Sequence, residues 1–337
     1  MKLKVLETNP NDSNWKDFVN FHKQLYSKSE IQRVDTVPIT GVDGVCLLAI
    51  LEDKAVGRCV VFPNRRTQEA IDCSATLGYY ECKPQEAFAR ILLKEAEAKA
   101  QSWGLKSIIG PVNGFSSWDS YRFKTSLNAK PFFMENHHLD YYPFQWQENG
   151  FHSIKKYFSH RVDQVVYDSF HLNALSAEMH AKGFEIHPFS LSNPEQELES
   201  LYSLILEGFA DGFLFQSITR KEFVLRYLKA LPMIKPEYVF LAKNKEALPI
   251  GFLFAYLDVL DPSGKTLVVK TLVRRADSDF KGVGQWLSNE LMKRASVSGI
   301  ETVIPAYMAE NARSHFTASL FDSKQSTEYR LFSKDVY

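Results

Sequence analysis

The sequence has no excess of charge of either sign and no long hydrophobic run. The 337-residue chain contains 40 Lys and Arg against 40 Asp and Glu, so its formal net charge is zero. A protein that coats nucleic acid or an anionic membrane needs a positive field, so we expect neither as a partner. No window approaches the roughly 18 consecutive apolar residues that a membrane helix requires.

Cysteine is also scarce, and its pattern excludes the usual metal and disulfide frameworks. Cys46, Cys59, Cys73 and Cys82 form no C-x-x-C pair, and no histidine stands at a zinc-like spacing from them. We therefore expect buried free thiols and no metal. Residues 1–15 contain no apolar leader segment and no small-residue cleavage site, so we expect a cytoplasmic protein.

What the sequence does contain is typical of a folded globular protein. Hydrophobic residues make up 45% of the chain and charged residues 24%, with 25 Phe and 15 Tyr available for a core. At about 150 residues per domain, the length predicts two domains.

The two halves of the chain have the same predicted order of strands and helices. Alternation and helical spacing predict strands over 2–7, 45–51, 56–62, 70–80 and 107–110, with helices over 14–26 and 84–103. The second half repeats this order, with strands over 184–189, 238–242, 250–257, 266–273 and 301–304 and helices over 195–209, 222–231 and 280–298. We predict an α/β fold with a mixed sheet, duplicated as domains 1–165 and 166–337.

The stretch most informative about chemistry is residues 270–285. A strand ends near Val273, a polar turn follows, and Gly282 and Gly284 open a long amphipathic helix. Such glycines let backbone N–H groups approach an anion, and the helix N-terminus supplies unpaired donors. The pattern is neither the dinucleotide fingerprint nor a Walker loop. It indicates a pyrophosphate cradle, with tight packing as the alternative reason for the glycines.

This stretch resembles motif A of the GNAT (Gcn5-related N-acetyltransferase) superfamily, in which Q/R-x-x-G-x-G/A binds the pyrophosphate of acetyl-CoA. Gly282 and Gly284 match, whereas Asp279 stands where Gln or Arg is expected and Phe280 replaces a frequent Gly. The resemblance implies acetyl-CoA, or another acyl-CoA, as cosubstrate. The implied cofactor-binding residues are Leu272, Val273, Arg274, Lys281, Gly282, Val283, Gly284, Gln285 and Asn311.

Downstream residues resemble the same superfamily. Asn311 and Ala312 resemble the start of its fourth helix, which often carries a Tyr as general acid for the departing thiolate. Here that Tyr is missing from its usual place, and Tyr307 and His315 are the candidate catalytic residues by proximity. A structural role for each remains the alternative.

The first half resembles a bacterial tandem-GNAT family without a well-defined substrate. The signatures are Gly57-Arg58, Gly78-Tyr79-Tyr80-Glu81, Gly110-Pro111-x-Asn113, Pro131-Phe132-x-Met134, and Tyr141-Tyr142-Pro143 to Gly150-Phe151. The turn at residues 80–84 has no glycine, and Pro84 removes a backbone donor. We therefore expect that this half has lost its CoA cradle.

Together these features predict acyl transfer from acetyl-CoA, or another acyl-CoA, to an amine of a small molecule or peptide. Two alternatives stay open: a non-catalytic ligand-binding module on a GNAT scaffold, and a tRNA-dependent aminoacyltransferase of the cross-bridge type. The sequence leaves the acceptor, the general base and the oligomeric state open.

Overall fold

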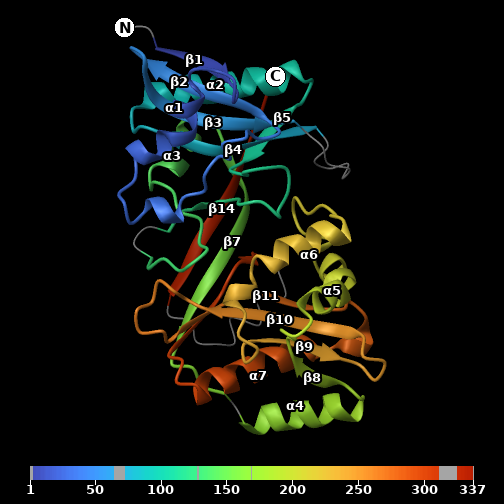
Figure 1. Cartoon of the computed structure of the whole chain (residues 1–337). Coiled ribbons are helices and arrows are strands. Elements are labelled where there is room, and N and C mark those ends of the chain that lie inside the picture. Colours follow the sequence, from blue (N-terminus) through green and yellow to red (C-terminus); the bar gives the residue numbers. More distant parts are fainter. Residues whose placement is uncertain (1–2, 64–72, 127–128, 168, 311–324, 337) are drawn as a thin grey trace.

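The computed structural model describes residues 3–63, 73–126, 129–167, 169–310 and 325–336, which form one mixed sheet flanked by helices (Figure 1). The strands are β1 (Leu3–Thr8), β2 (Val45–Leu51), β3 (Lys54–Phe62), β4 (Ser74–Cys82), β5 (Ser107–Gly110), β6 (Phe123–Lys124), β7 (His152–Asp163), β8 (Glu185–Pro188), β9 (Val239–Lys243), β10 (Pro249–Leu257), β11 (Thr266–Arg274), β12 (Thr302–Pro305), β13 (Met308–Ala309) and β14 (Gln325–Asp335). The α-helices are α1 (Trp15–Asn20), α2 (Glu86–Ser102), α3 (Tyr142–Glu148), α4 (Ser169–Ala181), α5 (Pro194–Phe209), α6 (Arg220–Leu228) and α7 (Val283–Val297). None of these helices is long and apolar enough to span a bilayer.

The sheet runs in the order β1-β2-β3-β4-β5-β14-β7-β12-β11-β10-β9-β8. We call β1 to β5 with α1, α2 and α3 the first lobe, and β8 to β12 with α4 to α7 the second lobe. Among the described strands, only β4 with β5 and β11 with β12 pair in parallel, and the other neighbours are antiparallel. The expected α/β fold with a mixed sheet is confirmed.

The two lobes exchange their last strands. β7, from the first half of the chain, pairs with β12 of the second lobe, and β14, from the end of the chain, pairs with β5 of the first lobe. β7 and β14 also pair with each other, and Figure 1 shows them as the long strands that join the lobes. The division at residue 165 remains a prediction, but the sheet itself is not divided at one point of the sequence.

The exchanged strands carry core residues with them. Phe332 of β14 is fully buried in the core of the first lobe, beside Trp146 of α3. Val162 of β7 is buried in the core between the second-lobe sheet and α7. Burying one large apolar side chain stabilises a fold by about 1.5–3 kcal/mol, so each lobe depends on residues from the other half of the chain.

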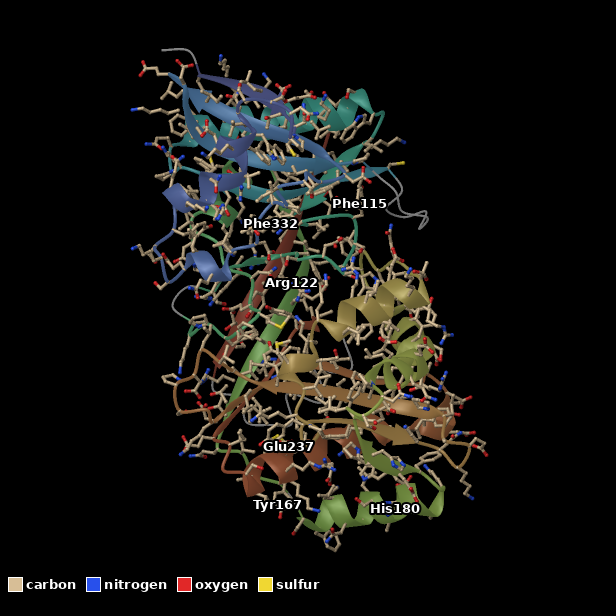
Figure 2. The ribbon with its side chains drawn as sticks, viewed as in Figure 1. Phe115, Arg122, Tyr167, His180, Glu237 and Phe332 are labelled. Carbon is tan, nitrogen blue, oxygen red and sulfur yellow. The ribbon has the colours of Figure 1, made fainter. Side chains whose placement is uncertain are left out.

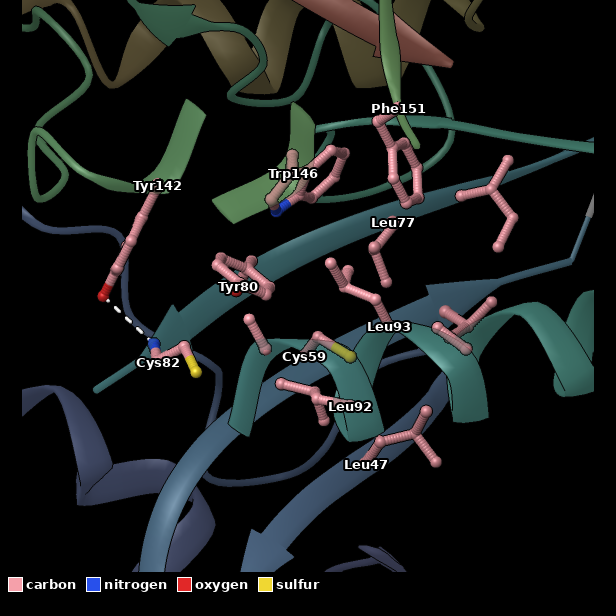
Figure 3. Packing of buried hydrophobic residues seen from close by; sticks show 14 of the residues in the cluster. Leu47, Cys59, Leu77, Tyr80, Cys82, Leu92, Leu93, Tyr142, Trp146 and Phe151 are labelled. Carbon is pink, nitrogen blue, oxygen red and sulfur yellow. Dashed lines mark hydrogen bonds between the residues drawn. The ribbon is translucent and has the colours of Figure 1, made fainter. Parts of the chain in front are cut away.

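The long helix of each lobe packs on the sheet through the stripe that the sequence predicts. In α2, Phe88, Leu92 and Ala96 recur every four residues and are buried against β3 and its neighbours, as Figure 3 shows for Leu92. In α7, Val283, Leu287, Leu291 and Ala295 form the corresponding stripe. α5 and α6 cover the opposite face of the second-lobe sheet.

Several local predictions need correction. The predicted helix over 14–26 is broken, because α1 ends at Asn20 and a 3-10 turn (Phe21–Gln24) follows. The helix predicted over 222–231 ends at Leu228, ahead of Pro232, and a second 3-10 turn (Leu231–Met233) takes its last residues. All four cysteines are free, and three are buried, but Cys73 is exposed because it lies just before β4 begins.

Candidate acyl-donor cleft

A cleft opens in the second lobe where two parallel strands separate. β11 and β12 pair from Thr266 with Thr302 to Val269 with Pro305, and the amide of Ala306 donates the last bond to Val269 O at 3.0 Å. β11 then continues to Arg274. The segment after β12 turns away from β11, and its next strand, β13, pairs with β7. The empty volume is about 760 Å³, including the part open to solvent. Its lining residues are Val162, Phe209, Leu253, Val269, Lys270, Leu272, Ser288, Leu291, Met292, Val303, Pro305, Ala306, Tyr307 and Met308.

A β-bulge lies at the point of separation. In the pairing of β10 with β11, Phe254 is opposite Thr271 and Ala255 is opposite Val269, so Lys270 has no opposite residue. A bulge twists the strand and redirects a side chain. The Lys270 ammonium nitrogen lies 4.9 Å from the ring centre of Tyr307, and both residues line the cleft.

The N-terminus of α7 follows β11 across a short polar loop. Gly282 is the N-cap, with a left-handed φ of 93°, and Trp286 N–H donates the first helical bond to Gly282 O at 2.9 Å. The amides of Val283, Gly284 and Gln285 have no acceptor within the described parts of the chain. A Cβ added at Gly284 would meet no atom within 4 Å, so a side chain at this position would have open space. Free amides and the helix dipole together favour an anion.

The first lobe repeats the same frame but closes it. β4 and β5 pair in parallel, and β4 carries a bulge in which Tyr79 and Tyr80 lie opposite a single residue of β3. The chain after β5 then crosses the bulge: Tyr79 N–H donates to Asn113 Oδ1 at 2.6 Å, and a Cβ at Gly78 would lie 2.0 Å from Val112 O. The space beside Gly78 is therefore filled by the backbone of Val112 and Asn113.

No protein-family model and no curated protein sequence matches the chain, but solved structures do. It is similar to a tandem GNAT protein from the clavulanic acid biosynthesis pathway, with a TM-score of 0.58 and 10% identity over 100% of this chain and 99% of that one. It is also similar to a GCN5-related N-acetyltransferase from Sphaerobacter thermophilus, with a TM-score of 0.54 and 11% identity over 99% of this chain and 96% of that one. For a probable N-acyltransferase from Enterococcus faecalis V583, the TM-score is 0.55 and the identity is 11%, over 100% of this chain and 73% of that one. The chain has the tandem GNAT fold.

The resemblance that the sequence suggested is thus confirmed at the level of the fold. In this tandem GNAT fold, β11 carries the bulge and α7 is the next α-helix along the chain in the second lobe. Among the residues implied as cofactor-binding, Leu272 lines the cleft, whereas the Val273 side chain is buried in contact with Gly208. Lys281 and Gln285 are exposed beside the helix N-terminus. Tyr307 lines the cleft, and Asn311 and His315 lie outside the described residues.

The basic residues of the loop have different surroundings. Arg274 Nη1 donates to the carbonyls of Arg275, Ala276 and Asp277, so it holds the loop together. Arg275 is engaged elsewhere, because its Nη1 lies 2.7 Å from Glu207 Oε2. Among these cations Lys281 is the most exposed, and the binding roles expected for Lys281 and Arg274 remain predictions.

Lys270 is the functional candidate that the sequence analysis missed. Burial lowers the pKa of Lys270 to about 8, with a smaller contribution from the nearby charge of Arg122. An amine with this pKa is partly unprotonated near neutral pH. The signal available in the sequence was a single charged residue inside the run TLVVKTLV, whose other members are Leu, Val and Thr.

A metal site has no candidate in the described residues. No three His, Cys, Asp or Glu side chains there lie close enough together to hold an ion. His138, from the Glu-Asn-His-His stretch, instead accepts from Lys124 N–H at 2.7 Å through its Nε2, and burial lowers its pKa to about 4. It is a structural histidine beneath Phe123.

Proposed function

We propose that the protein is an acyl-CoA-dependent N-acyltransferase whose reaction takes place in the second-lobe cleft. The observation that carries this proposal is the cleft beside the separated strands, lined by Lys270 and Tyr307, in the same lobe as the free amides at the start of α7. The acceptor is an amine of a small molecule or peptide, and acetyl-CoA is the first donor to test. The free cysteines support a cytoplasmic location.

The pyrophosphate of the donor would bind at the N-terminus of α7. The amides of Val283, Gly284 and Gln285 are the available donors, and the exposed Lys281 adds a positive charge beside them. The pantetheine arm would then follow the backbone of Leu272 and Val273 towards the bulge. The acidic Asp279, exposed in the same loop, would weaken this interaction without preventing it.

The reaction joins the acceptor nitrogen to the thioester carbon and breaks the carbon–sulfur bond, giving an amide and free CoA. Holding amine and thioester in contact supplies much of the rate. Lys270, with its pKa of about 8, would accept the proton that the amine loses. Burial raises the pKa of Tyr307, so its phenol is neutral and would be the donor to the departing thiolate.

The direct test is binding of acetyl-CoA to wild-type protein and to Gly284→Glu. Because Gly284 faces open space, the added carboxylate should leave the fold intact and repel the phosphates. Acetyl-CoA at 100 times its Kd would stabilise the wild type by about 2.7 kcal/mol, measured as a rise in Tm, and the variant should lose most of this rise. Release of CoA thiol in the presence of candidate amines then tests turnover.

Gln85→Glu is the matched control, because Gln85 is the N-cap of α2, the corresponding helix of the first lobe. It should keep the full response to acetyl-CoA. Absence of any rise in Tm for the wild type would instead favour the non-catalytic binding module. If acetyl-CoA raised the Tm of Gly284→Glu as much as that of the wild type, the pyrophosphate site would not lie at the start of α7.

A further inference from the structure

A second cavity lies in the first lobe, next to the bulge of β4 and separate from the acyl-donor cleft. Its empty volume is about 450 Å³, including the part open to solvent. Its lining residues are Val34, Asp35, Tyr79, Tyr80, Glu81, Pro111, Asn113, Ser120, Tyr121, Arg122, Phe123, Asn136, His137 and His138. The two cavities have no lining residue in common.

The Arg122 side chain in the lining of this cavity lacks hydrogen-bond partners for two of its nitrogen atoms among the described residues. This residue is only 4% exposed, and its backbone has a left-handed φ of 76°, which is uncommon for a residue with a side chain. Its Nε and Nη1 are buried and have no hydrogen-bond partner in the described parts of the chain, and the guanidinium forms no ion pair there. A buried charge without a partner is costly, so a fold that keeps one points to a ligand.

Aromatic contacts hold the guanidinium without satisfying its donors. Its carbon lies 3.6 Å from the ring centre of Tyr121, 4.3 Å from that of Tyr157 and 4.2 Å from that of Tyr307. Rings attract a cation through their faces, but the N–H bonds of a guanidinium lie in its own plane. The three tyrosines therefore position Arg122, which lies between the two lobes in Figure 2, and they give its Nε and Nη1 no hydrogen-bond acceptor.

The acidic groups around the cavity are already engaged. Glu81 accepts from Tyr26 at 2.9 Å and from Tyr142 at 2.6 Å, and burial raises its pKa to about 7. Asp35 accepts from Asn113 Nδ2 at 2.9 Å and is exposed at the rim. Neither carboxylate neutralises Arg122, so an anion from outside the chain would have little competition.

We propose that this cavity binds a small carboxylate through Arg122. The carboxylate oxygens would accept from the unpartnered guanidinium donors, an interaction stronger than a hydrogen bond between neutral groups. The ring of Tyr307 touches Arg122 and also lines the acyl-donor cleft, so the bound anion would lie one side chain away from that cleft. The proposal goes beyond acyl transfer and does not depend on it.

The test uses ¹⁹F NMR with trifluoroacetate as the probe and trifluoroacetamide as its neutral counterpart. In wild-type protein the trifluoroacetate signal should broaden saturably, and the trifluoroacetamide signal should not. Arg122→Gln should weaken trifluoroacetate binding by about tenfold. Arg90→Gln, which changes an exposed arginine on α2, should bind as the wild type does.

A second variant keeps the test valid if Arg122→Gln fails to fold. Ser120→Phe adds bulk at the lining of the cavity while keeping the arginine, and it should also abolish the broadening. Three results would overturn the proposal: equal broadening by the neutral probe, unchanged affinity in Arg122→Gln with a wild-type Tm, or full binding in a folded Ser120→Phe.

Discussion

The two lobes have the same strand frame but make different use of it. Each has one parallel strand pair, and each has a bulge where that pair ends, at Tyr79–Tyr80 in the first lobe and at Lys270 in the second. In the first lobe the chain after β5 returns across the bulge, and the Asn113 side chain accepts a hydrogen bond from the Tyr79 amide. In the second lobe the chain after β12 leaves to pair with β7, and a cleft remains. The route of one short segment therefore decides how large an opening this frame keeps, about 760 Å³ in the second lobe against about 450 Å³ in the first, both including the part open to solvent.

The largest expected effect comes from separating the lobes. A fragment of residues 1–165 lacks β14, so β5 and β7 lose their shared partner and the Phe332 site in the core is empty. Exposed strand edges and a missing core side chain should prevent cooperative folding. We expect no sharp thermal transition by circular dichroism for this fragment alone, and recovery on mixing with residues 166–337. A fragment that melts sharply by itself would show that the exchange of strands is dispensable.

A second prediction contrasts two glycines, one in each lobe. Gly78→Ala would drive a methyl group into the Val112 carbonyl, whereas Gly284→Ala would add the same methyl to open space. We expect Gly78→Ala to lower the free energy of unfolding by about 3 kcal/mol and Gly284→Ala to change it by less than about 0.5 kcal/mol, both measured by urea denaturation. Similar losses at both positions would contradict close backbone packing at Gly78 and open space at Gly284.

A third prediction concerns the bulge lysine. The pKa of Lys270 is about 8 in the folded protein against 10.5 ordinarily, so between these pH values the unfolded state binds more protons and stability rises with pH. Lys270→Met removes this penalty and should be more stable than wild type by about 2 kcal/mol at pH 7, a figure reduced for partial exposure. The difference should shrink towards pH 10.5.

Urea denaturation of both proteins at pH 7 and pH 10 measures this effect. Lys221→Met is the control, because Lys221 is an exposed lysine of α6. A constant gap between wild type and Lys270→Met across this pH range would mean that the amine is not desolvated.

The smallest expected effect lies in the loop before α7. Asp279 is exposed in that loop, where an acid opposes a bound pyrophosphate. Asp279→Asn should tighten acetyl-CoA binding by about twofold to fivefold at low salt, measured by calorimetry, and the gain should fade as salt increases. Weaker binding in the variant would indicate that the acid has a positive role in this site.

Much of the fold follows from local patterns in the sequence. The stripes of α2 and α7, the hairpins and the order of elements are set by periodicity over a few residues, which is why they could be predicted. The start of a helix at Gly282 and Gly284 could also be predicted, because it depends on a few neighbouring residues. The break after Asn20 was not, because the apolar spacing continues through the 3-10 turn.

The candidate sites divide in the same way. Gly282, Gly284 and Lys281 lie within one short stretch, so the sequence could suggest them together. Lys270 lies on β11 and Tyr307 lies between β12 and β13. Arg122 meets the rings of Tyr157 and Tyr307 because β7 and β13 pair. No spacing in the sequence carries such contacts.

The sequence by itself determined two copies of one α/β unit. It also showed that glycines open the long helix of the second copy and that the turn before the long helix of the first copy has none. Only the tertiary structure decided which strand completes which lobe, which copy keeps the larger cleft, and that Nε and Nη1 of Arg122 are buried without a hydrogen-bond partner in the described residues. The physical reason is range: propensity and periodicity act between neighbours along the chain, whereas strand exchange, cleft filling and burial depend on residues up to hundreds of positions apart, as in the pairing of Ile109 with Ser333.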